Sequence, residues 1–278
     1  MPYSFIPHQM YRMPTHFGPA TGPRQGPDGR RFECKDNPKT TSISVSFLTD
    51  PAQLKPLLPP SFSLAGEPVV TVAVTYMTEI EWLAGRGYNT LGVSFPATFR
   101  GEQETATGSF LTVLWENLTD PIITGREELG FAKIYCELPE PTVLAGKWHA
   151  TASWLGFRFL DIHAENLVQQ TPAEIAATTQ ATASDGTLHF KYMPRTGEWG
   201  TADVAYACLT PAATPNRVIT ERMTGQGSIE FHPARWEDMP TQYNIVNTFA
   251  ALEIREYRGA NITKTIGGKD LSDQRILR

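Results

Sequence analysis

One lysine stands where the flanking residues predict that the chain enters a core. The segment from Gly125 to Tyr135 reads GREELGFAKIY, and Lys133 lies between the apolar pairs Phe131-Ala132 and Ile134-Tyr135. Most lysines are exposed, and a surface position on an edge strand is the common interpretation of such a residue. A buried lysine has other chemistry, because burial lowers the pKa of the amine and turns an ammonium into a nucleophile. The local pattern leaves both interpretations open.

Other reactive groups show no spacing typical of a site. The six histidines are scattered, and no pair has the His-x-x-x-His or Cys-x-x-Cys spacing of metal ligands on one element. The pair His163 and Glu165 is typical of a surface, so we expect no metal. The run GGKD at 267–270 lacks the rest of a phosphate loop, and no Gly-x-Ser-x-Gly motif occurs. We therefore expect no cofactor, and we interpret Cys136 as a small buried hydrophobe.

The composition indicates an ordinary globular protein. The chain has 278 residues, of which 41% are hydrophobic and 19% charged, with a formal net charge of -5. An acidic chain without a basic run is not expected to bind nucleic acid. We find neither a secretory signal nor an apolar run of membrane-spanning length, so we expect a cytoplasmic protein that does not bind membranes. Its three cysteines, Cys34, Cys136 and Cys208, suit reduced thiols.

Strand patterns dominate the chain after an irregular start. Residues 1–40 are dense in Pro, Gly and charge and predict an N-terminal arm, followed by a single domain over 41–278. Helices are predicted at 51–59, 171–180 and 243–256. Alternating or continuous apolar residues predict strands at 41–50, 68–77, 109–117, 133–138, 187–194, 204–210, 227–232 and 257–266, with two or three more over 142–166. We expect an α+β fold, mainly antiparallel, curved into a barrel or packed as a sandwich with a few peripheral helices.

The triplet Gly125-Arg126-Glu127, followed after five residues by Lys133, resembles the signature of the acetoacetate decarboxylase superfamily. In that family the triplet precedes a lysine that forms a Schiff base. The resemblance extends from about residue 40 to the C-terminus, through FLTDPAQLKPLLPPSF (47–62), KYMPRTG (191–197) and YRGANITKTIGG (257–268). It implies a mostly antiparallel curved sheet that closes into a cone-shaped barrel around the lysine, and a homo-oligomer.

The same resemblance implies a reaction and also a departure from it. Lys133 would form an imine with a small keto substrate, and the protonated imine would accept the electrons of a breaking bond. The decarboxylases carry a second lysine directly after the first, where this chain has Ile134. They carry a glutamate in the region matching GYNTLG (87–92), where this chain has Asn89 and Thr90, and an arginine where only Lys39 is at hand. The chain therefore resembles the decarboxylase-like branch that lacks the second lysine.

Further site residues follow from the resemblance. Tyr257 matches a position where that branch places a tyrosine able to shuttle a proton, and a packed aromatic is the equal alternative. Arg126 and Glu127 would brace the loop before the lysine. The candidates for contact with the substrate are Arg126, Glu127, Asn89, Thr90, Glu116 and Arg100, and Arg86 or Arg100 would meet a substrate carboxylate.

Three classes of function remain. The first is a lyase whose Lys133 supports aldolase or dehydratase chemistry on a keto substrate, with decarboxylation of a β-keto acid as the alternative reaction. The second is a barrel that binds a small molecule without covalent chemistry, as a cyclase of secondary metabolism would. The third is a structural subunit of an oligomer, which an exposed Lys133 would favour.

Overall fold

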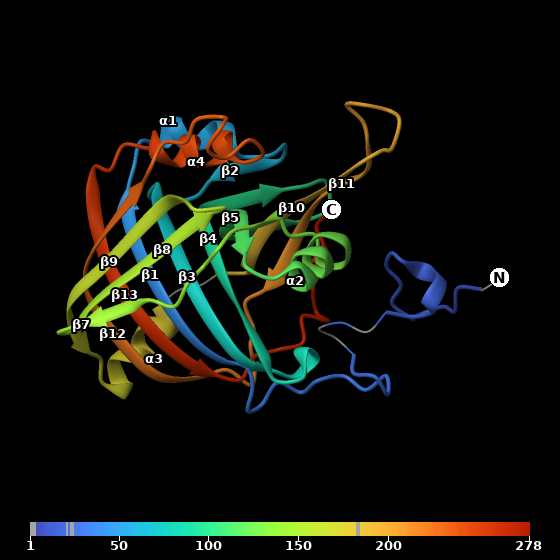
Figure 1. Ribbon diagram of the computed structural model, residues 1–278, viewed down its shortest axis with the longest axis horizontal. Coiled ribbons are helices and arrows are strands. Elements are labelled where there is room, and N and C mark those ends of the chain that lie inside the picture. The colour runs from blue at the N-terminus through green and yellow to red at the C-terminus, as the bar shows by residue number, and fades with distance from the viewer. Residues whose placement is uncertain (1–3, 21, 23–24, 182–183) are drawn as a thin grey trace.

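The computed structural model describes residues 4–20, 22, 25–181 and 184–278. A curved, mostly antiparallel β-sheet forms the body of the protein, and a few short helices lie around it (Figure 1). The longest strands bend around a common core, and α1 and α4 lie together over one end of them (Figure 1). This is the mainly antiparallel arrangement with few helices that the strand patterns predict.

The strands of the sheet are β1 (Lys39–Leu48), β2 (Phe62–Leu64), β3 (Val69–Ile80), β4 (Arg86–Arg100), β5 (Thr105–Glu116), β6 (Lys133–Tyr135), β7 (Thr142–Leu144), β8 (Lys147–Trp154), β9 (Phe157–Gln169), β10 (Gly186–Pro194), β11 (Ala202–Pro211), β12 (Val218–Phe231), β13 (Glu256–Ile266) and β14 (Arg275–Ile276). The α-helices are α1 (Pro51–Leu54), α2 (Thr119–Thr124), α3 (Pro172–Ala181) and α4 (Tyr243–Ala250). Short 3-10 turns are η1 (Thr15–Phe17), η2 (Lys55–Leu57) and η3 (Glu81–Leu83), and η4 (Gly125–Leu129) is π-helical.

The strand order is β14-β11-β10-β5-β4-β3-β1-β13-β12-β9-β8-β7, with β2 paired to β4 and β6 paired to β5. The pairs β10–β5 and β5–β6 are parallel. Among the described residues no pairing joins β14 to β7. The mostly antiparallel sheet is therefore confirmed, and its closure into a cone-shaped barrel stays a prediction.

Alternation along the strands places the core on one face of the sheet. In β1, Ile43, Val45 and Phe47 are at most 2% exposed, while the residues between them are half-buried. The register of β1 sets Val45 opposite Val72 of β3, whose buried residues alternate in the same way. Each such side chain contributes about 1.5–3 kcal/mol by leaving water, and a slip of one residue would expose the whole set.

Most strands lie where the alternating patterns predict them, and the segment 142–166 forms three strands, β7 to β9. The strand predicted at 133–138 is shorter, because pairing with β5 ends at Tyr135. β4 was not predicted, since its sequence contains Gly92 and Pro96, which are typical of loops. Pro96 costs no ladder hydrogen bond here because it lies where β4 changes partner, from β3 at Ser94 to β2 at Ala97.

The helices are shorter than predicted. The helix expected over 243–256 ends at Ala250, since β13 begins at Glu256 and Arg255 already donates its backbone N–H to Leu48 of β1. The segment 51–59 divides into α1 and η2, with Asp50 as the N-cap of α1 and Pro51 at its first position. No helix within the described ranges is long and apolar enough to cross a membrane.

The described part of residues 1–40 is mostly irregular, with one 3-10 turn and one isolated bridge between Gly22 and Gln25. It contacts α2 and η4, because Arg12 forms an ion pair of 3.3 Å with Glu128 and also contacts Thr124. The division at residue 40 stays a prediction.

The side-chain amide of Gln242 joins α4 to β5 and β6. Gln242 precedes α4 and is 5% exposed. Its Oε1 accepts a hydrogen bond of 2.7 Å from Nε1 of Trp115 in β5, and its Nε2 donates one of 2.9 Å to the carbonyl oxygen of Tyr135 in β6. Loss of this amide would leave two buried polar groups without partners.

We expect Gln242→Ala to lower the free energy of unfolding by about 1–3 kcal/mol for those unpaired groups. Urea denaturation followed by fluorescence measures the change. The matched control is Gln103→Ala, because Gln103 is exposed, and there the change should stay within about 0.5 kcal/mol. Equal effects of the two substitutions would show that the amide does not join these elements.

Candidate active site

A single excursion of the chain brings Lys133 beside the end of β5. The chain leaves β5 after Glu116, forms α2 and η4, and returns as β6, which pairs in parallel with β5 so that Lys133 lies opposite Leu114. The turn out of η4 is made by Gly130, whose φ of 80° lies in the left-handed region that favours glycine. The helical segments therefore cover the point where Lys133 enters the sheet.

Lys133 is buried against a carboxyl group. Its Nζ lies 2.8 Å from Oε1 of Glu116, and the two side chains are 6% and 1% exposed. The amine also donates a hydrogen bond of 3.1 Å to the carbonyl oxygen of Pro121 and lies 5.5 Å from the ring centre of Phe131. An exposed Lys133 would have favoured a purely structural subunit, and this position does not.

Burial pushes both groups of the pair toward their uncharged forms. It lowers the pKa of Lys133, and the nearby charge of Glu116 offsets part of that change. It raises the pKa of Glu116, with the ammonium of Lys133 acting in the opposite direction. Burial is the larger effect on each pKa, so the pair favours a neutral amine beside a protonated acid.

Glu116 is close to Lys133 and still lacks hydrogen bonds. The 2.8 Å contact satisfies the distance of an ion pair, yet neither carboxylate oxygen has a partner of hydrogen-bond geometry among the described residues. Buried polar atoms without partners are rare and concentrate at functional sites. The carboxyl group is thus free to bond a third group.

The triplet before the lysine shapes its position. A Cβ atom on Gly125 would lie 2.6 Å from Nζ of Lys133 and closer still to its aliphatic carbons, so any other residue there would displace the lysine side chain. Nη1 of Arg126 donates a hydrogen bond of 2.9 Å to the backbone carbonyl of Lys133. The backbone carbonyl of Glu127 accepts one of 2.5 Å from Nζ of Lys191. The contacts of Arg126 and Glu127 thus hold the backbone around the lysine.

His189 is a neighbour of the site that the sequence analysis missed. It is fully buried in β10 and stacks on Phe131, with ring centres 4.2 Å apart. Nδ1 lies 3.0 Å from the carbonyl oxygen of Gly130, and burial lowers the pKa of His189 to about 4. The ring is therefore neutral at pH 7, with the Nδ1 proton assigned from that contact. Nothing in the spacing of residues 187–194 signals this position, because the parallel pairing of β10 with β5 creates it.

Tyr88 is a second missed neighbour. Burial raises the pKa of its hydroxyl, and the charge of Glu116 raises it further. Tyr88 precedes by two residues Thr90, which lies opposite Glu116 across β4 and β5. It also lines a cavity of about 300 Å³ together with Met77, Ile80 and Trp82. From the sequence, only Asn89 and Thr90 of the segment GYNTLG were considered as site residues, and Tyr88 was not.

The remaining predicted residues divide into those near the pair and those away from it. Thr90 lies opposite Glu116. Asn89 points elsewhere, since its Nδ2 donates a hydrogen bond of 2.8 Å to the carbonyl oxygen of Leu138. Arg100 lies at the opposite end of β4, where its Nη1 donates a hydrogen bond of 2.7 Å to Oγ of Ser63. Arg86 is exposed and donates to the carbonyl of Leu83.

Tyr257 is also away from the lysine. It lies on β13, which β1, β3 and β4 separate from β5 in the sheet. Its hydroxyl contacts the backbone nitrogen and oxygen of Ile229, each at 3.2 Å. The structure therefore brings neither residue to Lys133: the order of the strands separates Tyr257 from it, and Arg100 lies at the other end of β4.

Solved structures with this fold are known. An acetoacetate decarboxylase from Legionella pneumophila subsp. pneumophila str. Philadelphia 1 shares 19% identity, over 93% of this chain and 96% of its own, with a TM-score of 0.64. An acetoacetate decarboxylase-like enzyme from Sphingomonas wittichii RW1 shares 18% identity, over 87% and 92%, with a TM-score of 0.61. The enduracididine biosynthesis enzyme MppR, solved with the condensation product of pyruvate and imidazole 4-carboxaldehyde, shares 16% identity, over 90% and 93%, with a TM-score of 0.56.

Identities this low show the fold alone, and no curated protein matches the chain. The family is shown by a separate comparison, in which the model of the acetoacetate decarboxylase (ADC) family matches residues 12–265. That range includes the Gly125-Arg126-Glu127 triplet and Lys133. The chain therefore belongs to the acetoacetate decarboxylase family.

Proposed function

We propose that the protein is a lyase that forms an imine between Lys133 and a small keto substrate. The observation that carries the proposal is the buried amine of Lys133, 2.8 Å from Glu116, with a pKa lowered by burial. A lysine amine must be neutral to attack a carbonyl, and at its ordinary pKa only about one in a few thousand is neutral at pH 7. The burial of Lys133 supports the proposal because it lowers the pKa of the amine and so favours the neutral form that can attack a carbonyl.

Glu116 would act as the acid and base of the reaction. The neutral amine attacks the carbonyl carbon and forms a carbinolamine. The carboxyl group of Glu116 then gives its proton to the departing oxygen, which leaves as water, and the resulting carboxylate faces the positively charged imine. In an aldol-type cleavage that carboxylate removes the proton of a β-hydroxyl group, and the imine accepts the electrons of the breaking carbon-carbon bond. In a dehydration the carboxylate removes a proton from the carbon next to the imine, which accepts the electrons of that carbon-hydrogen bond; the enamine then expels the hydroxyl group, which takes the proton back from Glu116 and leaves as water. A positioned acid of this kind contributes about 10²–10⁴ in rate.

This arrangement favours aldolase or dehydratase chemistry over decarboxylation. The charged neighbour of the Lys133 amine is Glu116, and the position after Lys133 holds Ile134, which faces a cavity on the other side of β6 with Arg126 and Ala132. An acid beside the amine serves proton transfer, whereas a substrate carboxylate would need a cation there. MppR, a protein of the same fold, has been solved with the condensation product of pyruvate and imidazole 4-carboxaldehyde. Decarboxylation of a β-keto acid is the second reaction.

We further propose that the substrate contacts Tyr88 and Thr90, which lie on the β4 side of Glu116. The cavity of about 300 Å³ lined by Tyr88 would be the route of entry, since the side chain of Lys133 is 6% exposed. Family membership also supports a single domain over 41–278, a closed barrel and a homo-oligomer, as parts of the same proposal.

Borohydride reduction should trap an adduct on Lys133 when 2-oxo or 3-oxo acids are supplied, and peptide mass spectrometry locates it. Lys133→Met should abolish both the adduct and turnover, because it removes the nucleophile and keeps the volume. The control is Lys55→Met, since Lys55 is exposed, and it should react as the wild type does. Turnover that persists in Lys133→Met would instead favour a barrel that binds its ligand without covalent chemistry.

Glu116→Gln should separate the two roles of the carboxyl group. The ionised form of Glu116 raises the pKa of Lys133, and glutamine has no such form, so the onset of trapping should move to lower pH. The substitution also removes the proton donor, so turnover should fall by about 10²–10⁴. The pH profile of trapping and the steady-state rate measure these changes, with Glu102→Gln at an exposed position as control. An unchanged onset together with an unchanged rate contradicts the role of Glu116.

Gly125→Ala should displace the amine through one methyl group. The backbone of Gly125 is helical, with φ of -63°, so the substitution causes no backbone strain and its effect comes from the contact with Lys133. We expect a loss of about 1–3 kcal/mol in the free energy of unfolding and slower trapping. In the control, Gly268→Ala, the added Cβ would meet only Cδ of Pro38 at 3.9 Å. Equal trapping rates in the two variants would show that the glycine does not set the position of the amine.

A further inference from the structure

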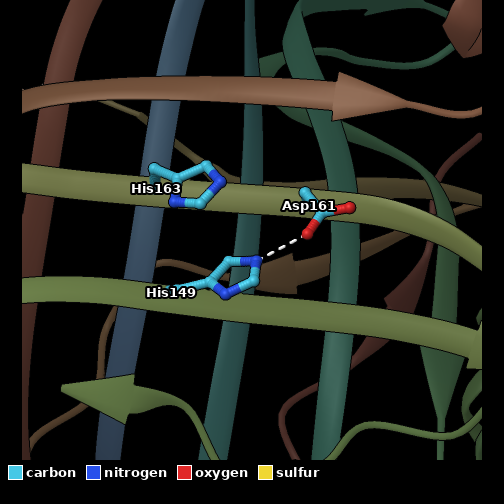
Figure 2. A group of neighbouring side chains, drawn as sticks. All are labelled: His149, Asp161 and His163. Atoms are coloured by element: carbon cyan, nitrogen blue, oxygen red, sulfur yellow. Dashed lines mark hydrogen bonds and ion pairs between the residues drawn. The ribbon is translucent and has the colours of Figure 1, made fainter.

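Three of the six histidines gather around one aspartate on strands far from Lys133 in the sheet order. His149 of β8 lies directly opposite His163 of β9, and Asp161 lies two residues before His163, on the same face of β9. His232 follows β12, whose Glu230 lies opposite Asp161. Figure 2 shows the side chains of His149, Asp161 and His163 grouped on two neighbouring strands. No metal was expected from the sequence, because these residues do not have the spacing of ligands on one helix or strand. They come together because β8 and β9 pair as a hairpin.

The aspartate is buried and each of its oxygens contacts a different imidazole. Its side chain is 8% exposed. Oδ1 lies 2.5 Å from Nε2 of His149, and Oδ2 lies 2.6 Å from Nε2 of His232 and 3.2 Å from Nε of Arg158. His232 and Arg158 thus fix one side of the carboxylate, and its other oxygen faces His149 (Figure 2).

His163 is not needed to satisfy the aspartate. Its ring stacks on that of His149, with centres 4.3 Å apart and planes 7° from parallel. No hydrogen bond of this ring is recorded within the described part of the chain, while one ligand atom each of His149, Asp161 and His163 lies within 4.8 Å of the others. A buried aspartate that only needed charge neutralisation would be satisfied by His149, His232 and Arg158. The third imidazole makes the group a set of two nitrogens and one oxygen around a common point.

We propose that His149, Asp161 and His163 bind one divalent transition-metal ion of the zinc class. Zinc takes His nitrogen and carboxylate oxygen at about 2.0–2.2 Å. Nε2 of His149 and Oδ1 of Asp161, which are 2.5 Å apart, would therefore separate to admit the ion between them, and His163 would complete the set. The proton between His149 and Asp161 would leave when the ion binds, since the ligating imidazole must be neutral. His232 and Arg158 would hold the carboxylate through its other oxygen, as the outer partners of metal ligands do.

The site has access from solvent and room for a further ligand. His163 is exposed and lines a cavity of about 460 Å³ with Glu165, Gln226 and Ser228. Nitrogen and carboxylate donors together suit zinc, copper and nickel better than calcium or magnesium, which prefer oxygen alone. The ion would connect β8 to β9, and it would stabilise the folded chain because the unfolded chain does not assemble the three ligands.

Isothermal titration of the full, untagged chain with zinc chloride tests the proposal, after chelator treatment and dialysis. We expect one equivalent bound per chain and a higher melting temperature. His149→Gln and His163→Gln should each weaken binding at least tenfold, and His8→Asn, at an exposed histidine of the N-terminal segment, should bind as the wild type does. Cobalt should give the visible absorption of a four-coordinate ion in the wild type and lose it in His163→Gln.

Absence of zinc binding by the wild type would overturn the proposal, and so would His163→Gln binding zinc as tightly as His8→Asn. His163 suits this test because it is exposed, so its substitution should leave folding intact, which circular dichroism checks. Lys133→Met should bind zinc normally. The metal site and the imine chemistry can therefore fail independently.

Discussion

An amine inside a folded protein loses the hydration that keeps it protonated in water, and Lys133 has lost nearly all of it. The segments around Lys133 keep its amine away from water. The excursion between β5 and β6 covers the amine, Gly125 leaves room for its stem, and the π-helical turn ends in a glycine that directs the chain back to the sheet. A one-residue change in the pairing of β6 would turn the lysine to the opposite face. The site therefore depends on register as much as on residue type.

Residues close together in sequence could be predicted to meet, because local geometry fixes their distance. The triplet at Gly125 and the lysine eight positions after its first residue belong to one turn, and the structure keeps them in contact through Arg126. Glu116 was among the predicted substrate contacts, and it ends the strand beside which the turn returns. His189 could not be predicted in this way. It lies on β10, and no local sequence pattern indicates that β10 pairs in parallel with β5.

The same limit explains the other misplaced or missed features. Tyr257 lies on a predicted strand, but the order of the strands sets it away from Lys133. Arg100 lies on β4, at the end of that strand opposite to Thr90. β4 was missed because a proline in a central strand normally removes a ladder hydrogen bond, and only the change of partner at Pro96 makes it harmless. The group around Asp161 likewise depends on one hairpin register. The periodicity of a strand predicts on which face of the sheet a side chain lies. The pairing of the strands determines which other side chains it contacts.

The identity of the charged neighbour determines how the amine of Lys133 can be activated. A second cation beside a lysine lowers its pKa by repulsion, and it does so even in a partly wet site. A carboxylate does the opposite, so here burial must exceed the attraction of Glu116 for the ammonium. Water that entered the site would restore the charged pair and abolish the nucleophile. A nucleophilic Lys133 therefore requires that His189 stays neutral and that α2 and η4 stay packed over the amine. Burial also raises the pKa of Glu116, so in the proposed mechanism its carboxyl group can supply the proton that imine formation needs, which a second lysine could not supply in its neutral form.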